Sequence, residues 1–345
     1  MRDLTGANIG ISPFLSGLWS RVRTGQQVLT APCNDEPVTS TLTPTRTVAI
    51  WGPLITLWLV WGSTYLGIAI VIASMPGLMA NGGRFLTAGL LLAVIVAATQ
   101  GVRTLRIPLQ ELAYSALLGV MLLGVGIGTL SIAQQYVPTG IAALLVAVIP
   151  LWIVVLRFAA KDRPSTLTQI GVVVGFGGIA LMMLPGGTVP VSGDDADVVL
   201  ASLAILCSAF VWAFFSYRST SFQLPKNAAV MTVYELLAAG MALVGIGALR
   251  GERWEPSTYT ASSWWGFAFL VVASIVGFTA YSWLLARAPM SLLSTYAYVN
   301  PVVAVLLGSL ILSEVITRDV LIGLLVIVGG VALVVTGERR RQLRS

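Results

Sequence analysis

The sequence contains no histidine, and it has few charged residues and few cysteines. The missing histidine removes the side chain that most often serves as metal ligand, proton shuttle or general base near neutral pH. The two cysteines, Cys33 and Cys207, are too few for a disulfide framework or a thiolate metal cluster. Charged residues make up only 10% of the chain, too little to cover a soluble globule. We therefore expect no metal site, no cofactor and no soluble enzyme.

Long hydrophobic segments fill most of the chain. Hydrophobic residues account for 57% of the 345 residues, and the mean hydropathy is +0.89. A helix needs about 20 apolar residues to cross the roughly 30 Å hydrocarbon layer of a bilayer. Ten such segments lie near residues 51–73, 79–99, 112–132, 139–159, 166–185, 198–217, 229–249, 264–286, 291–312 and 320–337. The sequence predicts an all-α integral membrane protein with ten transmembrane helices.

The second half of the chain repeats the first with a shift of about 151 residues. Matched positions include Trp61 and Trp212, Gly126 and Gly277, and Pro150 and Pro301. Each half holds five spans, and a unit with an odd number of spans delivers the chain to the opposite side of the membrane. We therefore predict two inverted five-helix repeats, at residues 47–187 and 198–337. Two inverted copies of one bundle are typical of carriers that open to either side.

The distribution of basic residues predicts the orientation, because loops left in the cytoplasm collect lysine and arginine. Alternate connections contain Arg103, Arg106, Lys161, Arg163, Arg218, Lys226 and Arg287. The loop at residues 186–197, on the other side, has no basic residue. Both termini are predicted to lie in the cytoplasm of a bacterial inner-membrane protein, as a disordered tail at 1–46 and a basic tail at 338–345. This loop bias also explains the net charge of +6, so nucleic acid is not an expected partner.

Four segments, taken in order, are similar to a known family. They read WGSTYLGIAI from Trp61, GRFLTAGLLLA from Gly83, PTGIAALLVAVIPLW from Pro138 and STYAYVNPVVAVLLG from Ser294. From about residue 50 to 337 the chain resembles the drug/metabolite transporter superfamily, in its ten-helix exporter branch of paired EamA domains. The resemblance implies paired inverted repeats, cytoplasmic termini and export of a small metabolite. It implies no single substrate, because the family handles amino acids, their derivatives and many toxic compounds.

Arg84 and Glu235 are the ionisable residues that stand out inside the predicted spans. A charge at the bilayer centre costs about 2.5 to 3.5 kcal/mol on insertion scales, so it usually faces a partner or a water-filled cavity. The two residues occupy equivalent positions in the two repeats. We expect both to line one central cavity, where Arg84 holds an anionic group of the solute and Glu235 holds an amine or a coupling proton. For Arg84 the alternative is snorkelling to the outer interface, which is the better interpretation for Arg157 and Glu314.

Aromatic and hydroxyl residues form a second group of candidates. They are Trp61, Ser63, Thr64 and Tyr65 in span one, and Trp212, Ser216 and Tyr217 in span six. Aromatic side chains deep in a span give flat apolar walls to a cavity for amphipathic solutes. The alternatives are an interfacial aromatic belt, and hydroxyl bonds from Ser63 and Thr64 to carbonyls of the preceding turn. Because Trp61 lies mid-span and Trp212 is its counterpart, we favour cavity lining.

Span nine combines a proline with polar side chains. Pro301 leaves a carbonyl near residue 297 without its donor, and Asn300 can offer an amide to that carbonyl or to a solute. Pro150 predicts the matching bend in span four, but Ile149 precedes it there. Asn300, Tyr296 and Tyr298 are therefore the better substrate candidates. The alternative is a structural kink with tyrosines packed between helices.

Glycines mark spans five and ten as packing elements. They are Gly171, Gly175, Gly177 and Gly178 in span five, and Gly323, Gly329 and Gly330 in span ten. Small residues at such spacings suit close helix contact. We expect these spans to form a stiff scaffold or a dimer seam, so the protein is a monomer or a homodimer.

Secondary transport is the function that the sequence favours. The chain has no GxxxxGK[S/T] loop for ATP, and an enzyme would need a nucleophile with a base or a metal site. We expect export of a small organic metabolite, such as an amino acid or amine, by alternating access, with proton antiport through Glu235 as one hypothesis. The alternatives are an uptake permease, a facilitated-diffusion carrier, a channel or a membrane scaffold.

Overall fold

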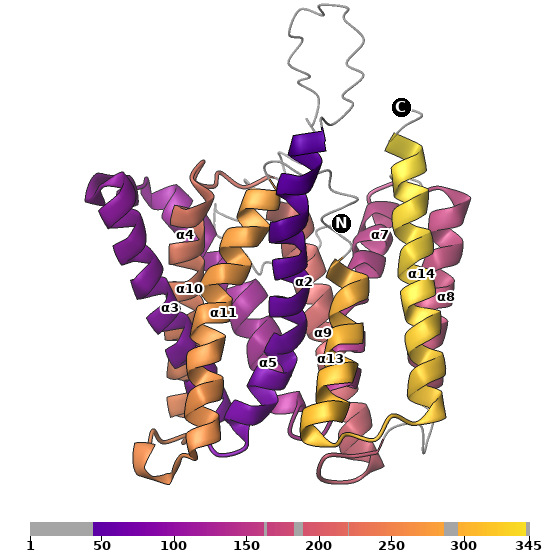
Figure 1. The fold of residues 1–345 in the computed structure, drawn as a ribbon. Helices are drawn as coiled ribbons and strands as arrows, with labels where there is room; N and C mark the ends of the chain where they lie inside the picture. Colours follow the sequence, from indigo (N-terminus) through magenta and orange to yellow (C-terminus); the bar gives the residue numbers. More distant parts are fainter. Residues whose placement is uncertain (1–43, 162–163, 183–188, 220, 286–295, 343–345) are drawn as a thin grey trace, which may run out of the picture. The chain divides into compact units, whose positions relative to one another are not determined.

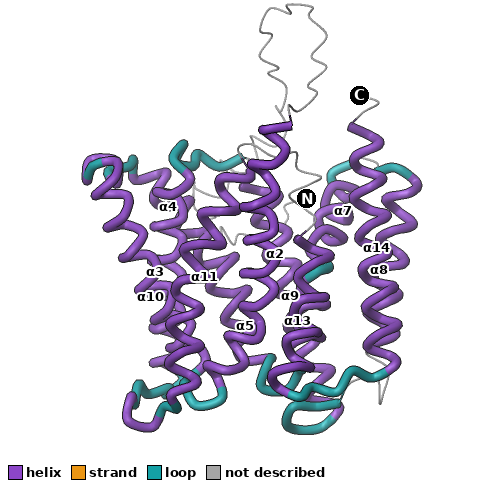
Figure 2. Tube along the Cα trace, viewed as in Figure 1, coloured by secondary structure: helices purple, strands orange, loops and turns teal. Residues whose placement is uncertain are grey.

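A computed structural model describes residues 44–161, 164–182, 189–219, 221–285 and 296–342. Every regular element in these ranges is a helix, and no strand occurs in them (Figure 1, Figure 2). The prediction of an all-α chain is confirmed for this part. Residues 1–43 of the predicted tail at 1–46 lie outside the described residues. At the other end the last helix continues to Gln342, beyond the predicted end of span ten at residue 337.

The helices follow one another with short connections. In chain order they are α2 (Pro44–Ile72), α3 (Gly77–Gln100), α4 (Leu109–Leu118), η2 (Gly119–Val125), α5 (Gly126–Ala133), α6 (Thr139–Val146), α7 (Ile149–Ala159), α8 (Thr166–Met182), α9 (Asp195–Ser219), α10 (Ala228–Leu249), α11 (Ala261–Leu285), α13 (Tyr296–Leu312) and α14 (Arg318–Gln342). Two short 3-10 helices lie at Val102–Leu105 and Pro256–Thr258. Each predicted span therefore contains helix.

Eight helical segments among the described residues are long and apolar enough to cross a membrane. They are Ile50–Ile72, Gly77–Gln100, Leu109–Ala133, Thr139–Ala159, Asp195–Ser219, Ala228–Leu249, Ala261–Tyr281 and Arg318–Gly337. Two shorter apolar helices, Thr166–Leu181 and Val299–Leu312, lie where spans five and nine were predicted. The predicted start of span nine falls in 286–295, outside the described residues. An integral membrane protein is supported, while ten spans in two inverted repeats stay a prediction.

The helices pack in pairs that join the two halves of the sequence. In Figure 1, α3 and α10 lie together on one side of the bundle, and α8 and α14 lie together on the other, with α2, α5, α9, α11 and α13 between them. Both pairs match helices at equivalent places in the two predicted repeats. The bundle is thus held together by contacts between one half and the other.

Glycines bring the paired helices to backbone contact. A methyl group added to Gly171 of α8 would lie 2.6 Å from the Gly330 carbonyl oxygen of α14. In the other pair, a methyl group on Gly82 would lie 2.9 Å from the Gly240 oxygen, and one on Gly240 would lie 2.9 Å from the Gly82 oxygen. Such small surfaces are the usual basis of tight helix packing in membranes. Part of the predicted glycine surface, at Gly171, Gly178 and Gly330, therefore serves a contact within the chain. A methyl group on Gly177 or Gly329 would meet no atom within 4 Å.

Spans three and four depart from a regular α-helix. Span three is interrupted by the π-helix η2, which the sequence did not predict. Span four is divided, because α6 ends at Val146 and α7 begins at Ile149 with Pro150 in its first turn. Proline is accepted there because the first turn needs no backbone donor. Pro301, by contrast, lies inside α13, so the bend expected there stays a prediction.

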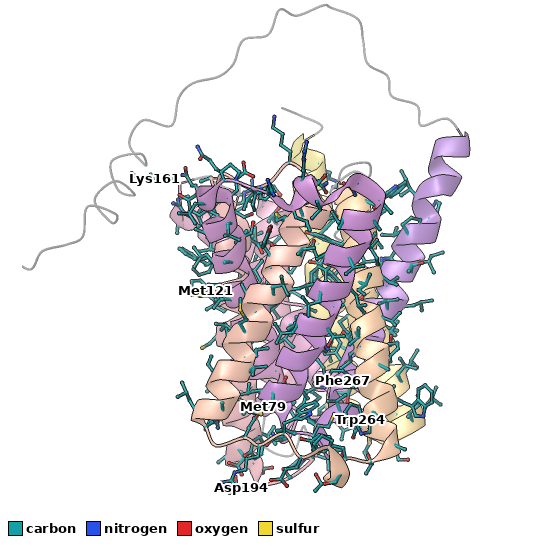
Figure 3. The ribbon with its side chains drawn as sticks, turned by 90° about the vertical axis from the view of Figure 1, so that its left-hand side faces the viewer. Met79, Met121, Lys161, Asp194, Trp264 and Phe267 are labelled. Carbon is teal, nitrogen blue, oxygen red and sulfur yellow. The ribbon has the colours of Figure 1, made fainter. Side chains whose placement is uncertain are left out.

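The outward faces of the helices are apolar, as a bilayer requires. On α3, Phe85 and Leu92 are buried while Leu90 and Val94 are exposed. A helix that is apolar all round belongs inside a large core or a membrane. Figure 3 places Lys161 and Asp194 at opposite ends of the bundle. A basic connection and an acidic loop thus lie on opposite sides, as the predicted orientation requires.

Candidate functional site

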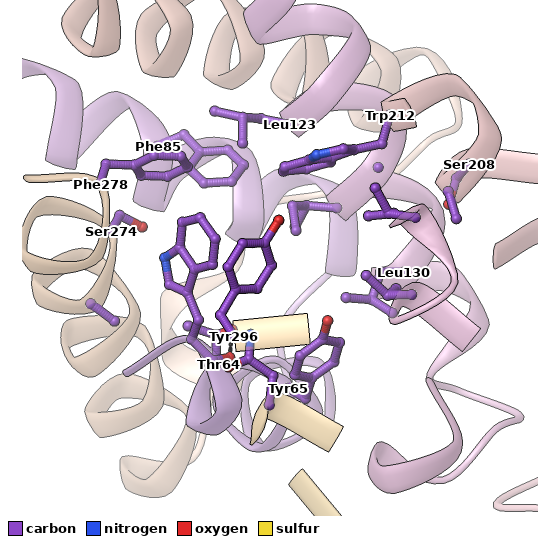
Figure 4. Close-up of a pocket in the computed structure, with 18 of the residues that line it drawn as sticks. Thr64, Tyr65, Phe85, Leu123, Leu130, Ser208, Trp212, Ser274, Phe278 and Tyr296 are labelled. Atoms are coloured by element: carbon purple, nitrogen blue, oxygen red, sulfur yellow. Dashed lines mark hydrogen bonds between the residues drawn. The ribbon is translucent and has the colours of Figure 1, made fainter. Parts of the chain in front are cut away.

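A cavity of about 100 Å³ lies inside the bundle (Figure 4). Its walls come from α2, α3, η2, α5, α6, α7, α9, α11 and α13. This volume holds several water molecules, since one water needs about 10 to 15 Å³ by the same measure. The expected cavity walls were spans one, two, six, seven and nine. The structure adds spans three, four and eight, and no residue of α10 in span seven lines the cavity.

One wall of the cavity is an aromatic cluster around Trp61. The Trp61 ring stacks on Tyr281 with centroids 5.3 Å apart. It meets Tyr296 edge-on at 5.2 Å and Phe278 edge-on at 5.7 Å. Trp212 faces the same space from α9, and Tyr65 and Tyr296 point into it (Figure 4). The cluster combines apolar ring faces with phenolic hydroxyl groups, which suits an amphipathic solute.

Each of the two cavity tryptophans rests on a glycine of a neighbouring helix. A methyl group on Gly277 of α11 would lie 2.7 Å from Cδ1 of Trp61. A methyl group on Gly126 of α5 would lie 3.0 Å from Cε3 of Trp212. The same shift of 151 residues relates the tryptophans to each other and the glycines to each other. The cavity is therefore built from two matching contacts, one from each half of the chain.

Arg84 lies on the cavity wall and is almost fully buried. It is two turns into α3, and only 4% of its surface is exposed. Its Cζ atom lies 4.4 Å from the centroid of the Phe85 ring. Its Nε and Nη1 atoms have no hydrogen-bond partner among the described residues. The snorkelling alternative for Arg84 is therefore not what the structure shows.

Glu235 is buried in α10 but does not line the cavity. Within the described residues, no hydrogen bond or ion pair joins it to Arg84. Its backbone packs on η2, because a methyl group on Gly119 would lie 2.6 Å from the Glu235 Cα atom. The close contact between α10 and the π-helix fixes Glu235 beside an irregular segment, and π-helices are frequent at functional sites. The structure therefore separates the two charged candidates.

The hydroxyl groups of span one bond to their own helix. Ser63 Oγ donates to the Leu59 carbonyl at 2.6 Å, and Thr64 Oγ1 donates to the Trp61 carbonyl at 2.6 Å. Bonding to the preceding turn, the alternative for these two residues, is what the structure shows. Thr64 still lies on the lining, whereas Ser63 does not. From span six, Ser216 and Tyr217 are also absent from the lining.

In span nine, Tyr296 and Asn300 line the cavity. With its amide oriented to satisfy its neighbours, Asn300 donates to the carbonyls of Trp58 and Tyr296, both at 3.2 Å. The bond to Trp58 ties α13 to α2, the bond to Tyr296 lies within α13, and together they use the amide for structure. The side chain of Tyr298 lies outside the described residues.

Two carboxylates from the second half of the chain cap helices of the first half. Glu252 accepts from the backbone N–H groups of Leu78 at 3.2 Å and Met79 at 2.8 Å. Glu314 accepts from those of Thr139 at 2.7 Å and Gly140 at 3.4 Å. Snorkelling of Glu314 was therefore wrong, because the helix N-terminus offers unpaired donors closer at hand.

A family model decides the class of protein. The model of the EamA-like transporter family matches residues 49–184 and 199–336, one domain in each half of the chain. The chain belongs to the EamA-like transporter family. The resemblance found in the sequence is confirmed.

Relatives of this EamA-family chain carry transporter names. The uncharacterized inner membrane transporter YedA of Escherichia coli strain K12 is 35% identical over 292 residues, covering 84% of this chain and 91% of YedA. The probable terminal-alkyne amino-acid exporter of Streptantibioticus cattleyicolor is 24% identical over 298 residues, covering 85% and 96%. A solved crystal structure, 22% identical, matches with a TM-score of 0.59 over 86% of this chain and 99% of that chain. That likeness shows the fold alone.

The EamA assignment settles the coarse function and location. The chain is a multi-pass membrane transporter, and its relationship to YedA supports the inner membrane. The family and the names of the relatives indicate a transporter rather than an enzyme. No group of three or more potential metal-ligating side chains occurs within the described ranges.

Several lining residues of this EamA-family cavity escaped the sequence prediction. Ser274 and Phe278 of α11 lie on the wall, and their counterparts at the shift of 151 residues, Leu123 and Ile127, lie on it too. Ser274 and Phe278 lie within one turn of Gly277, and Leu123 and Ile127 lie within one turn of Gly126. The repeat could therefore have predicted these lining residues, because the matched glycines mark the helix faces that contact the tryptophans.

Proposed function

We propose that this EamA-family protein exports a small organic solute by alternating access around the cavity. The matched contacts of Trp61 on Gly277 and Trp212 on Gly126 carry the proposal, because each half supplies one equivalent wall. Two such halves, inserted with opposite orientations, can rock against each other and open the same cavity to either side. The relative named as an amino-acid exporter supports the direction of transport.

The candidate binding residues are those that present chemistry to the cavity. We propose that Trp61, Tyr65, Trp212 and Tyr296 supply its aromatic surface and that Arg84 supplies its charge. Thr64 and Asn300 lie on the wall with their polar groups bonded to backbone, so their role is to shape the cavity. This reduces the candidate set from the longer list that the sequence suggested.

Glu235 is proposed as the coupling group rather than as a solute ligand. It is a buried carboxylate beside a π-helix, and ionisable groups inside membranes are commonly functional. A proton taken up by Glu235 would remove a charge from the contact between α10 and η2. Loss of this charge would change the strength of the contact between the two halves of the chain without any direct contact between Glu235 and the solute.

Counterflow in proteoliposomes tests the transport proposal. Vesicles preloaded with one unlabelled compound are supplied with its labelled form, over a panel of amino acids, amines, organic acids and nucleosides. We expect transient accumulation of one class of solute, and its loss in Trp212→Ala but not in Arg250→Gln, which changes an exposed residue outside the cavity. Absence of counterflow for every compound, or unitary current steps in bilayer recordings, would contradict a carrier.

The same vesicles with an imposed pH gradient test Glu235. Glu235→Gln keeps the shape of the side chain and removes its titration. We expect this variant to keep counterflow and to lose the flux that the pH gradient drives. Full pH-driven flux in Glu235→Gln would eliminate Glu235 as the coupling group and leave the carrier proposal standing.

A further inference from the structure

We infer that the solute is an organic carboxylate with a flat apolar body, and that Arg84 is its counter-ion. The inference rests on the proposed function, since it names the solute class for the same cavity. It departs from the amines and the amine-binding carboxylate that the sequence suggested. Three features of the wall carry it: the isolated charge, the unused hydrogen-bond donors, and the shape of the aromatic surface.

The charge on the wall is positive and unbalanced. Arg84 is the only ionisable Asp, Glu, Lys or Arg side chain among the described residues that line the cavity. The guanidinium Nε and Nη1 atoms lack partners, although the side chain is more than nine-tenths buried. An isolated buried charge is strongly unfavourable unless it is paired. Glu235, the other buried charged side chain among the described residues, forms no ion pair with it. A bound anion would supply the missing charge.

The wall also offers several unused hydrogen-bond donors to an anion. Ser208 and Ser274 donate to the carbonyls of Ile205 and Leu270, both at 2.8 Å, and Thr64 donates to Trp61. These hydroxyl protons are therefore already used, and each oxygen can only accept a further bond. The donors left for a solute on the described wall are the Arg84 guanidinium, the hydroxyls of Tyr65 and Tyr296, and the indole N–H groups of Trp61 and Trp212. A planar guanidinium fork matches a carboxylate with two parallel bonds.

The rest of the wall suits a flat apolar body. Trp61, Phe85, Trp212 and Phe278 present ring faces or edges to the cavity, and Leu123, Leu130 and Ile149 fill the spaces between them. Aromatic rings pack on other rings in stacked and edge-on arrangements, as Trp61 does with its neighbours. Phe85 already contacts the guanidinium carbon at 4.4 Å, so it holds Arg84 in place by a cation–π contact.

Three compounds of one size separate the possible charges of the solute. The compounds are 3-phenylpropionate, phenylalanine and phenethylamine, which share a phenyl ring and a short chain. They present a carboxylate alone, a carboxylate with an ammonium, and an ammonium alone. An ammonium near Arg84 meets a like charge and finds no carboxylate on the described wall. We expect affinity to fall in the order in which the compounds are named, with at least a tenfold difference between the first and the last.

The experiment is equilibrium binding of these radiolabelled probes to the purified full-length protein in nanodiscs. Arg84→Gln should weaken binding of 3-phenylpropionate at least tenfold and leave phenethylamine unchanged or better bound. Arg250→Gln removes an exposed arginine outside the cavity and should change neither probe. Melting temperatures show whether each variant is folded. If Arg84→Gln does not fold, Arg84→Lys keeps the positive charge without the fork, and it should preserve the order of the probes at lower affinity.

Two results would overturn the inference. One is phenethylamine binding as tightly as 3-phenylpropionate, and the other is a folded Arg84→Gln that binds 3-phenylpropionate like the wild type. Failure of the transport proposal looks different, because the binding measurement needs no flux. Counterflow of an amine without binding of the carboxylate would contradict the proposed solute class and leave the transport proposal standing. Binding of the carboxylate without counterflow of any solute would contradict the transport proposal and leave the solute class standing.

Discussion

Gly277 and Gly126 are the residues whose lack of a side chain shapes the cavity. Each allows a tryptophan ring to lie directly on a helix backbone. The Trp61 ring in turn orders Tyr281 and Tyr296, both within 5.3 Å of its centroid. The absence of a side chain at residue 277 therefore determines where the aromatic rings of α2, α11 and α13 can pack.

Gly277→Ala is expected to impair both stability and transport. The added methyl group would overlap Trp61, which cannot move away without disturbing the stacked Tyr281 ring. Overpacking of this kind costs about 1 to 3 kcal/mol. We expect a lower melting temperature and slower counterflow for a given solute.

The matched control for Gly277→Ala is Gly177→Ala in α8. No neighbouring atom lies within 4 Å of a methyl group placed on Gly177. Alanine in a helix interior is more favourable than glycine by about 1 kcal/mol, so this variant should be as stable as the wild type or more so. Equal behaviour of the two variants would contradict the role given to the tryptophan contact.

Sequence reasoning identified residues of the cavity better than their contacts. The cavity is lined by four residues that the sequence singled out, Trp61, Tyr65, Arg84 and Trp212. Aromatic or charged side chains inside a predicted span are unusual, which made these residues recognisable. The separation of Glu235 from Arg84 had no such signal. Equivalent positions in inverted repeats lie on different helices, and small shifts such as the π-helix η2 decide which of them reaches the cavity. Hydroxyl groups were ambiguous for a similar reason, since their rotamers choose between backbone and solute.

At the scale of helices, α3 and α6 are capped by residues distant in the sequence. Each follows a proline, and neither has a side-chain cap from its own N-terminal residue. Their free N–H groups are satisfied by Glu252 and Glu314, which are more than 170 residues away along the chain. Caps of this kind cannot be found from local sequence, whereas the helices themselves were found from hydrophobic length alone.

Removing either carboxylate should destabilise the contact between the halves. In Glu252→Gln and Glu314→Gln the charge that favours a helix N-terminus is lost and only one acceptor oxygen remains. We expect each change to cost about 1 kcal/mol and to lower the melting temperature of the purified protein. Glu255→Gln, an exposed residue beside Glu252, is the control and should melt like the wild type. A Glu314→Gln protein that melts with that control would show that the cap adds no stability.

At the scale of the whole molecule, the orientation in the membrane can be measured directly. Arg103 follows the C-terminal end of α3, and Ser257 lies just after Glu252, which caps the N-terminal end of α3. The 24 residues of α3, about 36 Å of helix, therefore separate Arg103 from Ser257. In a chain lacking Cys33 and Cys207, we expect Ser257→Cys to react with a membrane-impermeant maleimide in intact cells. Arg103→Cys should react only after the cells are opened.

Labelling of Arg103→Cys in intact cells would reverse the predicted orientation. Labelling of both positions would contradict a membrane-spanning α3. The native Ser257 and Arg103, in the same cysteine-free background, give the blank for each measurement. These results concern the topology alone and leave the identity of the solute untouched.

The two carboxylate caps also bear on how an empty carrier divides its time. Both caps join one half of the chain to the other. Glu252 and Glu314 follow the C-terminal ends of α10 and α13, in connections predicted to lie on the outer side of the membrane. Separating the two halves at this outer end would break both caps. Every 1.4 kcal/mol lost in this way shifts the equilibrium tenfold toward the state that is closed at that end. At the opposite end the halves meet through uncharged groups: Asn227 donates to the Gln100 side chain at 2.6 Å, the Tyr234 hydroxyl donates to the Leu105 carbonyl, and the Tyr114 and Phe222 rings stack with centroids 4.7 Å apart. For a carrier that works by alternating access in the predicted orientation, charged caps at the outer end and uncharged contacts at the inner end favour an idle population whose outer end is closed and whose inner end is open to the cytoplasm.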